Sequence, residues 1–207
     1  MLDRNALKLL SPWLDRAAAR LVRVGVGADA ITLVGFGLGL AAAAAIALGA
    51  MLTGLGLIVL SRLADGLDGP VARQTRPTDR GAFLDIALDF AFYASIPLAF
   101  AWAAPATNAL PAAVLLAAFI GTGSSFLAFA VLAERRGLKS LAYPSKGLYY
   151  LGGLTEGTET LLCFAAMCWW PAQFPLLATV FAGLCGLTWL ARLHAGWRLL
   201  KDADRPA

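Results

Sequence analysis

Charged side chains are scarce in this chain. Asp, Glu, Lys and Arg together make up 14% of its 207 residues, whereas 59% of the residues are hydrophobic. Soluble domains have about 25% charged and about 45–50% apolar residues. A soluble globular protein is therefore excluded, and we expect a single-domain integral membrane protein. A chain of this length has room for about five to seven transmembrane helices of about 20 residues each.

Soft metal ligands and reactive thiols are also few. His194 is the single histidine, and the three cysteines lie in apolar stretches without a CxxC pair. A disulfide framework or a thiolate zinc site is therefore not expected, and we interpret the cysteines as buried thiols. The net charge of +4 fits contact with anionic membrane lipids, so we expect no nucleic-acid partner.

The first 24 residues lack an uninterrupted apolar run. Charged residues break up every such run, so we do not expect a signal peptide. Leucines and Trp13 alternate with basic residues at near-helical spacing, which is typical of a helix lying in the headgroup plane. We therefore expect an N-terminal interfacial amphipathic helix over 1–24, with a simple charged tail as the alternative.

Long apolar runs predict the transmembrane helices. The first charge-free run, 30–61, is too long for one span, and its glycines at 49, 54 and 56 offer a turn. Prolines divide the later apolar tracts in the same way. We expect an all-α integral membrane protein with a six-helix bundle over 25–200 and a tail over 201–207. The six predicted transmembrane helices lie near 28–50, 52–74, 80–103, 110–134, 146–169 and 173–200.

The lysines and arginines lie on one side of this six-span arrangement. They occur in both terminal segments, in the connections near 73–80 and 134–146, and at Arg62. The opposite turns contain none. Because cytoplasmic loops are enriched in Lys and Arg, we expect both termini to be cytoplasmic. Residues 104–110 and 169–175 should then face away from the cytoplasm.

Four aspartates interrupt two consecutive apolar helices. Asp65 and Asp68 are three residues apart, and Asp85 and Asp89 are four apart, so each pair shares one helix face. A charge within a membrane helix costs about 2.5–3.5 kcal/mol. Four carboxylates in one cleft would repel one another unless cations neutralise them, and hard oxygen ligands favour Mg²⁺ or Mn²⁺.

Glycines and arginines surround these carboxylates. Gly66, Gly69 and Gly81 would let a bulky ligand approach the backbone closely. Arg73 and Arg80 add fixed positive charge that suits phosphate groups. The region therefore indicates a metal site with a phosphate-containing ligand beside it.

The spacing of these residues resembles the signature of the CDP-alcohol phosphotransferases. That signature is D-x-x-D-G-x-x-A-R, then seven or eight residues, then G-x-x-x-D-x-x-x-D. All eight fixed positions are present here: Asp65, Asp68, Gly69, Ala72, Arg73, Gly81, Asp85 and Asp89. Asp29 and Thr32, in the stretch from Ala28 to Thr32, also resemble an upstream P-N-x-x-T element of that family, with Ala28 in place of Pro and Asp29 in place of Asn.

The resemblance implies a specific reaction. Family members move a phospho-alcohol group from a CDP-linked donor, such as CDP-diacylglycerol, to an acceptor hydroxyl, and they release CMP in phospholipid biosynthesis. It further implies two Mg²⁺ or Mn²⁺ ions, a homodimer, and a cytoplasmic active site in a bacterial inner membrane.

The resemblance also assigns residues to roles. Asp65, Asp68 and Asp85 would bind the metals, and Asp89 would complete the metal site and act as the catalytic base. The cytidine diphosphate and substrate contacts would come from Asp29, Thr32, Gly66, Gly69, Ala72, Arg73 and Gly81.

The acceptor is less clearly indicated. Glycerol 3-phosphate or another small alcohol is expected, although Phe90 stands where enzymes for phosphorylated glycerol often have a basic residue. Glu156 and Glu159 could line the acceptor pocket or a subunit interface, or could be satisfied by threonine hydroxyls. Basic residues that could bind an acceptor phosphate, or could simply form the positive cytoplasmic rim, are Arg135, Arg136, Lys139, Lys146 and Arg192.

Two other functions remain as alternatives. A divalent-cation transporter would also have paired intramembrane carboxylates, but it should place them near the midplane and show an internal repeat. Here the aspartates crowd one end of two consecutive helices. A catalytically inactive lipid-binding relative is the second alternative, and the intact set of four aspartates speaks against it.

Overall fold

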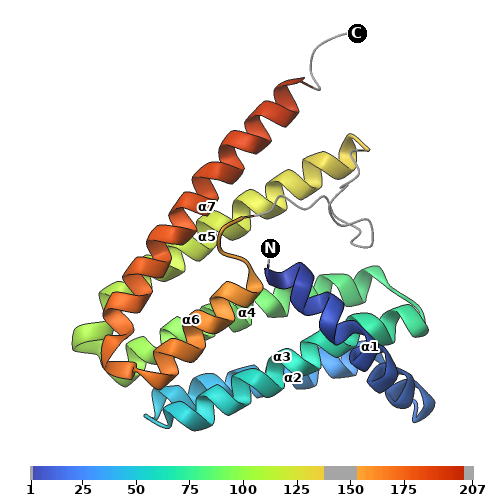
Figure 1. Ribbon diagram of the computed structural model, residues 1–207, viewed down its shortest axis with the longest axis horizontal. Coiled ribbons are helices and arrows are strands. Elements are labelled where there is room, and N and C mark those ends of the chain that lie inside the picture. The colour runs from blue at the N-terminus through green and yellow to red at the C-terminus, as the bar shows by residue number, and fades with distance from the viewer. Residues whose placement is uncertain (1, 138–152, 203–207) are drawn as a thin grey trace.

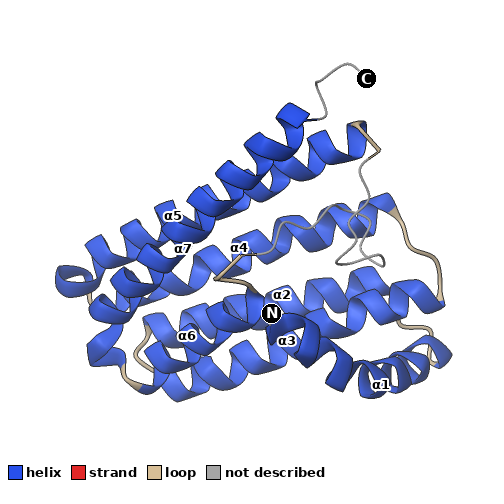
Figure 2. Cartoon of the chain, turned by 45° about the horizontal axis from the view of Figure 1, so that its top comes forward, coloured by secondary structure: helices blue, strands red, loops and turns tan. Residues whose placement is uncertain are grey.

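The computed structural model describes residues 2–137 and 153–202, and all of its regular elements there are helices (Figures 1 and 2). No strand occurs within these residues. This confirms the expected all-α fold. The helices are α1 (Leu2–Arg23), α2 (Ala28–Ala47), α3 (Met51–Gln74), α4 (Asp79–Ala103), α5 (Pro105–Arg135), α6 (Gly157–Trp169) and α7 (Phe174–Asp202), with a 3-10 turn at Pro171–Gln173 before α7.

Several of these helices are suited to cross a membrane. By length and hydropathy, α2, α4, α5 and the segment Pro171–Lys201 qualify among the described residues. The 24-residue α3 is long enough, but its charged residues lower its hydropathy, and α6 has only 13 residues. The count of six transmembrane helices therefore stays a prediction, as does the interfacial position of α1.

Two predicted helix starts differ from the observed ones. The helix expected from residue 110 begins at Pro105, because proline has no amide hydrogen to lose at the first helical position and its φ already suits a helix. The helix expected from residue 146 begins at Gly157. Residues 153–156 are not helical. The start of that stretch, with Lys146, lies outside the described residues, as does Lys139 before it.

The helices pack as two pairs joined by α4. α2 and α3 lie side by side, and α5 and α7 form a second pair that diverges from the first (Figure 1). α4 contacts both α2 and α5, and α1 packs across α3. The core between the pairs is aromatic, and Phe100 of α4 stacks on Phe174 of α7 with ring centroids 4.5 Å apart. This arrangement places the end of α3 and the start of α4 against α2.

Small residues let α2 approach its neighbours closely. A Cβ at Gly39 would lie 2.6 Å from Phe92 Cδ2 and 3.2 Å from Ser61 Oγ. A Cβ at Gly35 would lie 3.1 Å from the Cβ of Ala64. The close approach holds α2 against the part of α3 and α4 that contains the aspartates.

Replacing Gly39 with alanine should therefore destabilise the protein. The added methyl group would overlap Phe92, and overpacking of this kind typically costs about 1–3 kcal/mol. Gly37→Ala is the matched control, because a Cβ there meets nothing within 4 Å. Thermal unfolding in detergent should show a lower midpoint for Gly39→Ala alone; equal midpoints would contradict the close packing of α2.

Candidate active site

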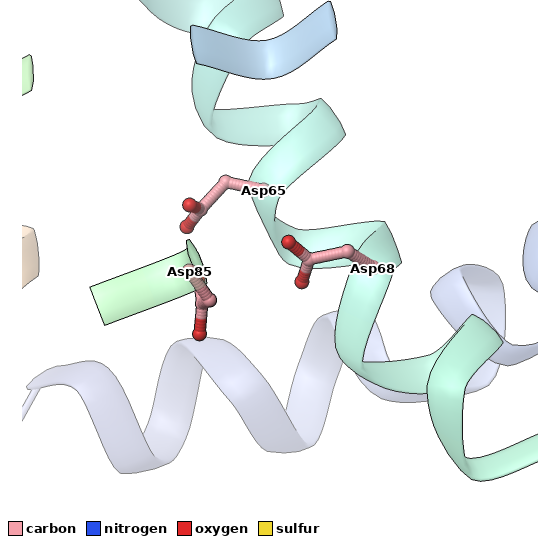
Figure 3. A group of neighbouring side chains, drawn as sticks. All are labelled: Asp65, Asp68 and Asp85. Carbon is pink, nitrogen blue, oxygen red and sulfur yellow. The ribbon is translucent and has the colours of Figure 1, made fainter. Parts of the chain in front are cut away.

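Three of the predicted aspartates converge. Asp65 and Asp68 come from α3 and Asp85 comes from α4, and their carboxylates point toward a common region (Figure 3). One carboxylate oxygen from each lies within 4.8 Å of the other two. These three residues, called the aspartate trio below, offer only hard oxygen ligands, which fit Mg²⁺ or Mn²⁺. Three of the four carboxylates that we expected in one cleft therefore converge.

The connection between α3 and α4 explains how these faces meet. Only residues 75–78 separate the two helices. Thr78 is the N-cap of α4, and its Oγ1 accepts a hydrogen bond of 3.1 Å from the Gly81 amide. Such a cap satisfies a backbone donor that the first turn would otherwise leave unpaired. It starts α4 at the position that brings Asp85 opposite Asp68.

α2 contributes a residue that orients the trio. The Thr32 hydroxyl donates a hydrogen bond of 2.7 Å to Asp68 Oδ2. Both side chains are buried. A charged acceptor makes such a bond stronger than a neutral one, so Thr32 holds one face of Asp68 in place. The stretch from Ala28 to Thr32 therefore lies at the site, despite its two departures from the family element.

Asp29 links the starts of α2 and α4. Its Oδ2 accepts a hydrogen bond of 2.6 Å from Arg80 Nη2, and this ion pair is largely exposed. An exposed pair contributes about 0–1 kcal/mol at most. A Cβ at Gly81 would lie 3.1 Å from Asp29 Oδ1, so glycine there leaves room for Asp29 beside α4.

A cavity of about 200 Å³ opens beside the trio. It is formed by α2, α3, the 75–78 connection and α4, and most of the predicted nucleotide-binding residues line it. Arg76, Pro77 and Thr78 also line it and were missed, since the signature leaves the residues between its two halves unspecified. The lining residues are Ala28, Asp29, Thr32, Asp68, Gly69, Ala72, Arg76, Pro77, Thr78, Gly81, Ala82 and Asp85.

Two predicted binding residues lie outside this lining. Gly66 faces α1, where a Cβ would lie 3.8 Å from Leu14. Arg73 is exposed, and its Nη2 lies 3.9 Å from Asp15 Oδ1 of α1. Its Nη1 lies 3.3 Å from the position of a Cβ on Gly69, so the guanidinium is at the edge of the cavity.

Asp89 pairs with an arginine that it shares with Asp65. Its Oδ1 accepts a hydrogen bond of 2.5 Å from Arg62 Nη1, which also lies 3.4 Å from Asp65 Oδ1. The set of three converging carboxylates does not include Asp89, so its role as a fourth metal ligand stays a prediction. Sequence reasoning noted the position of Arg62 but missed this contact, because the partner lies 27 residues away on another helix.

Comparison with known proteins identifies the family. The model of the CDP-alcohol phosphatidyltransferase family matches residues 26–191. The chain belongs to this family. A relative among curated proteins is the inner membrane protein YnjF of Escherichia coli (strain K12), which is 52% identical over 154 residues, or 74% of this chain and 75% of YnjF. The expected family resemblance is thus confirmed.

Solved structures share the fold of this phosphatidyltransferase family member. Mycobacterium tuberculosis phosphatidylinositol phosphate synthase (PgsA1) with bound CDP-DAG is 23% identical, with a TM-score of 0.65 over 89% of this chain and 93% of that one. Its complex with manganese and citrate is 23% identical, with a TM-score of 0.65 over 89% and 88%. The apo form is 22% identical, with a TM-score of 0.68 over 88% and 95%.

The candidate acceptor residues in the described part of the chain are not among the residues that line the cavity. Arg135 and Arg136 are exposed at the end of α5, where Arg136 Nη1 donates a hydrogen bond of 2.8 Å to the Leu200 carbonyl. Arg192 is 8% exposed, and its Nη1 donates to the Thr122 carbonyl over 3.2 Å. Lys139 and Lys146 lie outside the described residues. Arg135, Arg136 and Arg192 are thus outside the cavity lining.

Glu156 and Glu159 have a local structural role. Glu156 is the N-cap of α6, and its backbone amide donates a hydrogen bond of 3.1 Å to Glu159 Oε2. Glu156 Oε1 in turn accepts a bond of 3.1 Å from the Gly153 amide. Both of these partners are backbone amides. The two carboxylates form a reciprocal cap that starts α6.

Proposed function

We propose that this family member transfers a phosphatidyl group from a CDP-linked lipid donor, CDP-diacylglycerol, to the hydroxyl of an acceptor and releases CMP in phospholipid biosynthesis. The observation that carries the proposal is the convergence of Asp65, Asp68 and Asp85 beside a cavity whose lining includes the signature residues Gly69, Ala72 and Gly81. PgsA1, which shares the fold, has been solved with CDP-DAG and with manganese, and this supports a CDP-lipid donor and a divalent ion.

The aspartate trio is the proposed metal site. Its three carboxylates supply oxygen ligands for Mg²⁺ or Mn²⁺, and the hydrogen bond from Thr32 keeps Asp68 in position. A divalent ion bound there supplies positive charge that stabilises the donor diphosphate and the departing CMP.

The nucleotide is proposed to occupy the cavity. Gly69 and Ala72 give its wall little bulk, and Arg76 is part of the lining. Arg73 and Arg80 lie at its edge, on α3 and α4. Guanidinium groups bind phosphate oxygens through paired donors, so these arginines are suited to orient the diphosphate.

Asp89 is the proposed catalytic base. It lies one helical turn beyond Asp85 on α4, close enough to the trio for Arg62 to contact both Asp89 and Asp65. A carboxylate in this position can accept the proton of an acceptor hydroxyl as the new bond forms. The proposed acceptor is a small alcohol, and glycerol 3-phosphate remains one candidate.

The active site and both termini are proposed to be cytoplasmic. Arg76 of the 75–78 connection and Arg135 at the end of α5 lie on the side predicted to be cytoplasmic from the distribution of positive charge. A homodimer in a bacterial inner membrane is part of the same proposal. The location is supported by the inner membrane relative. The homodimer is supported by the family resemblance and by helices rich in glycine and alanine, which allow close contacts in lipid.

The reaction can be tested by measuring CMP release. Purified protein should release CMP from CDP-diacylglycerol with one of a panel of small hydroxyl acceptors, provided that Mg²⁺ or Mn²⁺ is present. EDTA should abolish the activity, and adding either ion back should restore it. Asp68→Asn should lose activity, because it changes a trio carboxylate, whereas Glu134→Gln changes an exposed carboxylate on α5 and should retain it.

Three results would contradict this proposal. Activity that survives exhaustive chelation would rule out the metal site. Ion binding without CMP release from any acceptor would favour the inactive relative, and Mn²⁺ flux into liposomes containing the protein would favour the transporter.

Asp85 and Asp89 of α4 should contribute differently to donor binding and to turnover. Asp89→Asn keeps the oxygen that accepts the Arg62 hydrogen bond but removes the basic carboxylate. Turnover should fall by about 10²–10⁴-fold, the usual contribution of a general base, while donor binding changes little. Asp85→Asn should weaken both, because the trio loses a carboxylate. Parallel measurements of donor affinity and turnover check this, and near-normal turnover of Asp89→Asn would exclude it as the base.

Sidedness can be tested by cysteine labelling in a variant without the native cysteines. Ala106 and Asp79 are both exposed, at the starts of α5 and α4 respectively, whereas Asn108 is buried and donates a hydrogen bond to the Phe100 carbonyl. A membrane-impermeant maleimide should label Ala106→Cys from outside intact cells. It should label Asp79→Cys only after the membrane is opened. The reverse pattern would invert the proposed orientation.

A further inference from the structure

Arg62 connects the aspartate trio to Asp89. Its Nη1 donates to Asp89 Oδ1 over 2.5 Å and lies 3.4 Å from Asp65 Oδ1. The Arg62 side chain is only 12% exposed. A single buried nitrogen of α3 therefore lies between a trio carboxylate and the fourth aspartate, which comes from α4.

Further contacts fix the Arg62 guanidinium in this position. Its Cζ lies 3.8 Å from the centroid of the Phe92 ring, an arrangement that attracts a cation to the aromatic face. Its Nη2 donates to Ser61 Oγ over 3.2 Å, and Ser61 in turn donates to the Gly35 carbonyl of α2 over 2.7 Å. Phe92 and Ser61 are fully buried. The guanidinium is thus held by groups of α3 and α4, with α2 behind Ser61.

This position is the one that a second metal ion would need. In two-metal sites the ions are about 3.5–4 Å apart, so a second ion would need oxygen ligands directly beside the trio. A second ion beside the trio would have to use Asp89, the remaining signature carboxylate, together with a trio member such as Asp65. Both of these carboxylates already face Arg62 Nη1. A divalent ion there would repel the guanidinium, and the contacts with Phe92 and Ser61 oppose its departure.

We propose that Arg62 takes the place of the second metal ion, so that the chain binds one divalent ion through Asp65, Asp68 and Asp85. The guanidinium supplies the second positive charge and holds Asp89 in place as a positioning residue. The inference rests on the proposed function only in taking the trio to be a metal site. It replaces the two ions that the family resemblance implies.

The number of bound ions tests this inference without any measurement of activity. Mn²⁺ is titrated into purified protein in the absence of donor, and bound ions are counted from the loss of the free-Mn²⁺ paramagnetic resonance signal. Wild-type protein should bind one Mn²⁺ per chain that Asp68→Asn removes. Arg62→Met should bind two, with spin coupling between neighbouring ions. Combining Arg62→Met with Asp89→Asn should return the count to one, because the second ion needs Asp89.

Three further variants separate charge from folding. Arg62→Gln is neutral but can still donate a hydrogen bond to Asp89, so it should also bind two ions if the methionine variant fails to fold. Arg62→Lys keeps a positive charge beside Asp89 and should bind one. Arg80→Met removes an equal charge from a pair with Asp29 and should also bind one. Thermal unfolding of each variant verifies its fold.

The outcomes distinguish this inference from the proposed function. Two spin-coupled Mn²⁺ ions in the wild-type protein would overturn the role of Arg62 and leave the metal site intact. Folded Arg62→Met and Arg62→Gln variants that still bind one ion would do the same. If the protein shows no Mn²⁺ binding that depends on Asp68, the trio is not a metal site, and the inference fails with it.

Discussion

Repulsion among the carboxylates at the junction of α3 and α4 is the constraint on which the rest of this region depends. Two like charges about 4 Å apart repel by about 4 kcal/mol at an effective dielectric constant of about 20. The trio brings three carboxylate oxygens within 4.8 Å of one another, in helices where each charge is already costly. The arrangement is stable only if neighbouring groups compensate the charge, and each of the surrounding contacts can be understood in this way.

The compensating groups come from three helices, and each requires close packing. Thr32 reaches Asp68 from α2, Arg62 reaches Asp65 and Asp89 from α3, and Arg80 neutralises Asp29 at the start of α4. α2 is near enough for the first of these contacts because Gly35 and Gly39 let it pack closely on α3 and α4. The electrostatic contacts of the site therefore depend on the apolar packing of the bundle.

The sequence predicted the parts of this site that follow from local spacing. Helical periodicity places Asp65 with Asp68, and a connection of a few residues brings Asp85 opposite them. The signature, together with Asp29 and Thr32 of the upstream element, then predicted most of the cavity lining. The contact between Arg62 and Asp89 was not predictable in this way, because it depends on the relative rotation of α3 and α4. Spacing within one helix carries no information about that rotation.

Of the helix ends, too, one was predictable from the local sequence and another was not. The start of α5 at Pro105 could have been inferred from the tolerance of proline at the first helical position. The start of α6 could not, because Glu156 and Glu159 were interpreted as intramembrane acids within a continuing apolar helix. Their carboxylates instead bond to the backbone amides of Gly153 and Glu156. An acid that satisfies a helix terminus does not need a cation or a substrate, which sets this pair apart from the aspartate trio.

The residues of the signature region that lie outside the cavity lining point to α1 as a part of the site's support. Gly66 lies against Leu14, and Arg73 pairs with Asp15, while Gln74 Nε2 donates a hydrogen bond of 3.0 Å to the Asp15 carbonyl. Ala18 of α1 is buried with Ile31 and Val71, so apolar contacts join α1 to α2 and α3 at this end of the bundle. The back of α3 therefore packs on α1 while its front holds the trio. The absence of a side chain has a different effect at each glycine. At Gly66 it lets α1 pack against α3, and at Gly69 it leaves space in the cavity wall.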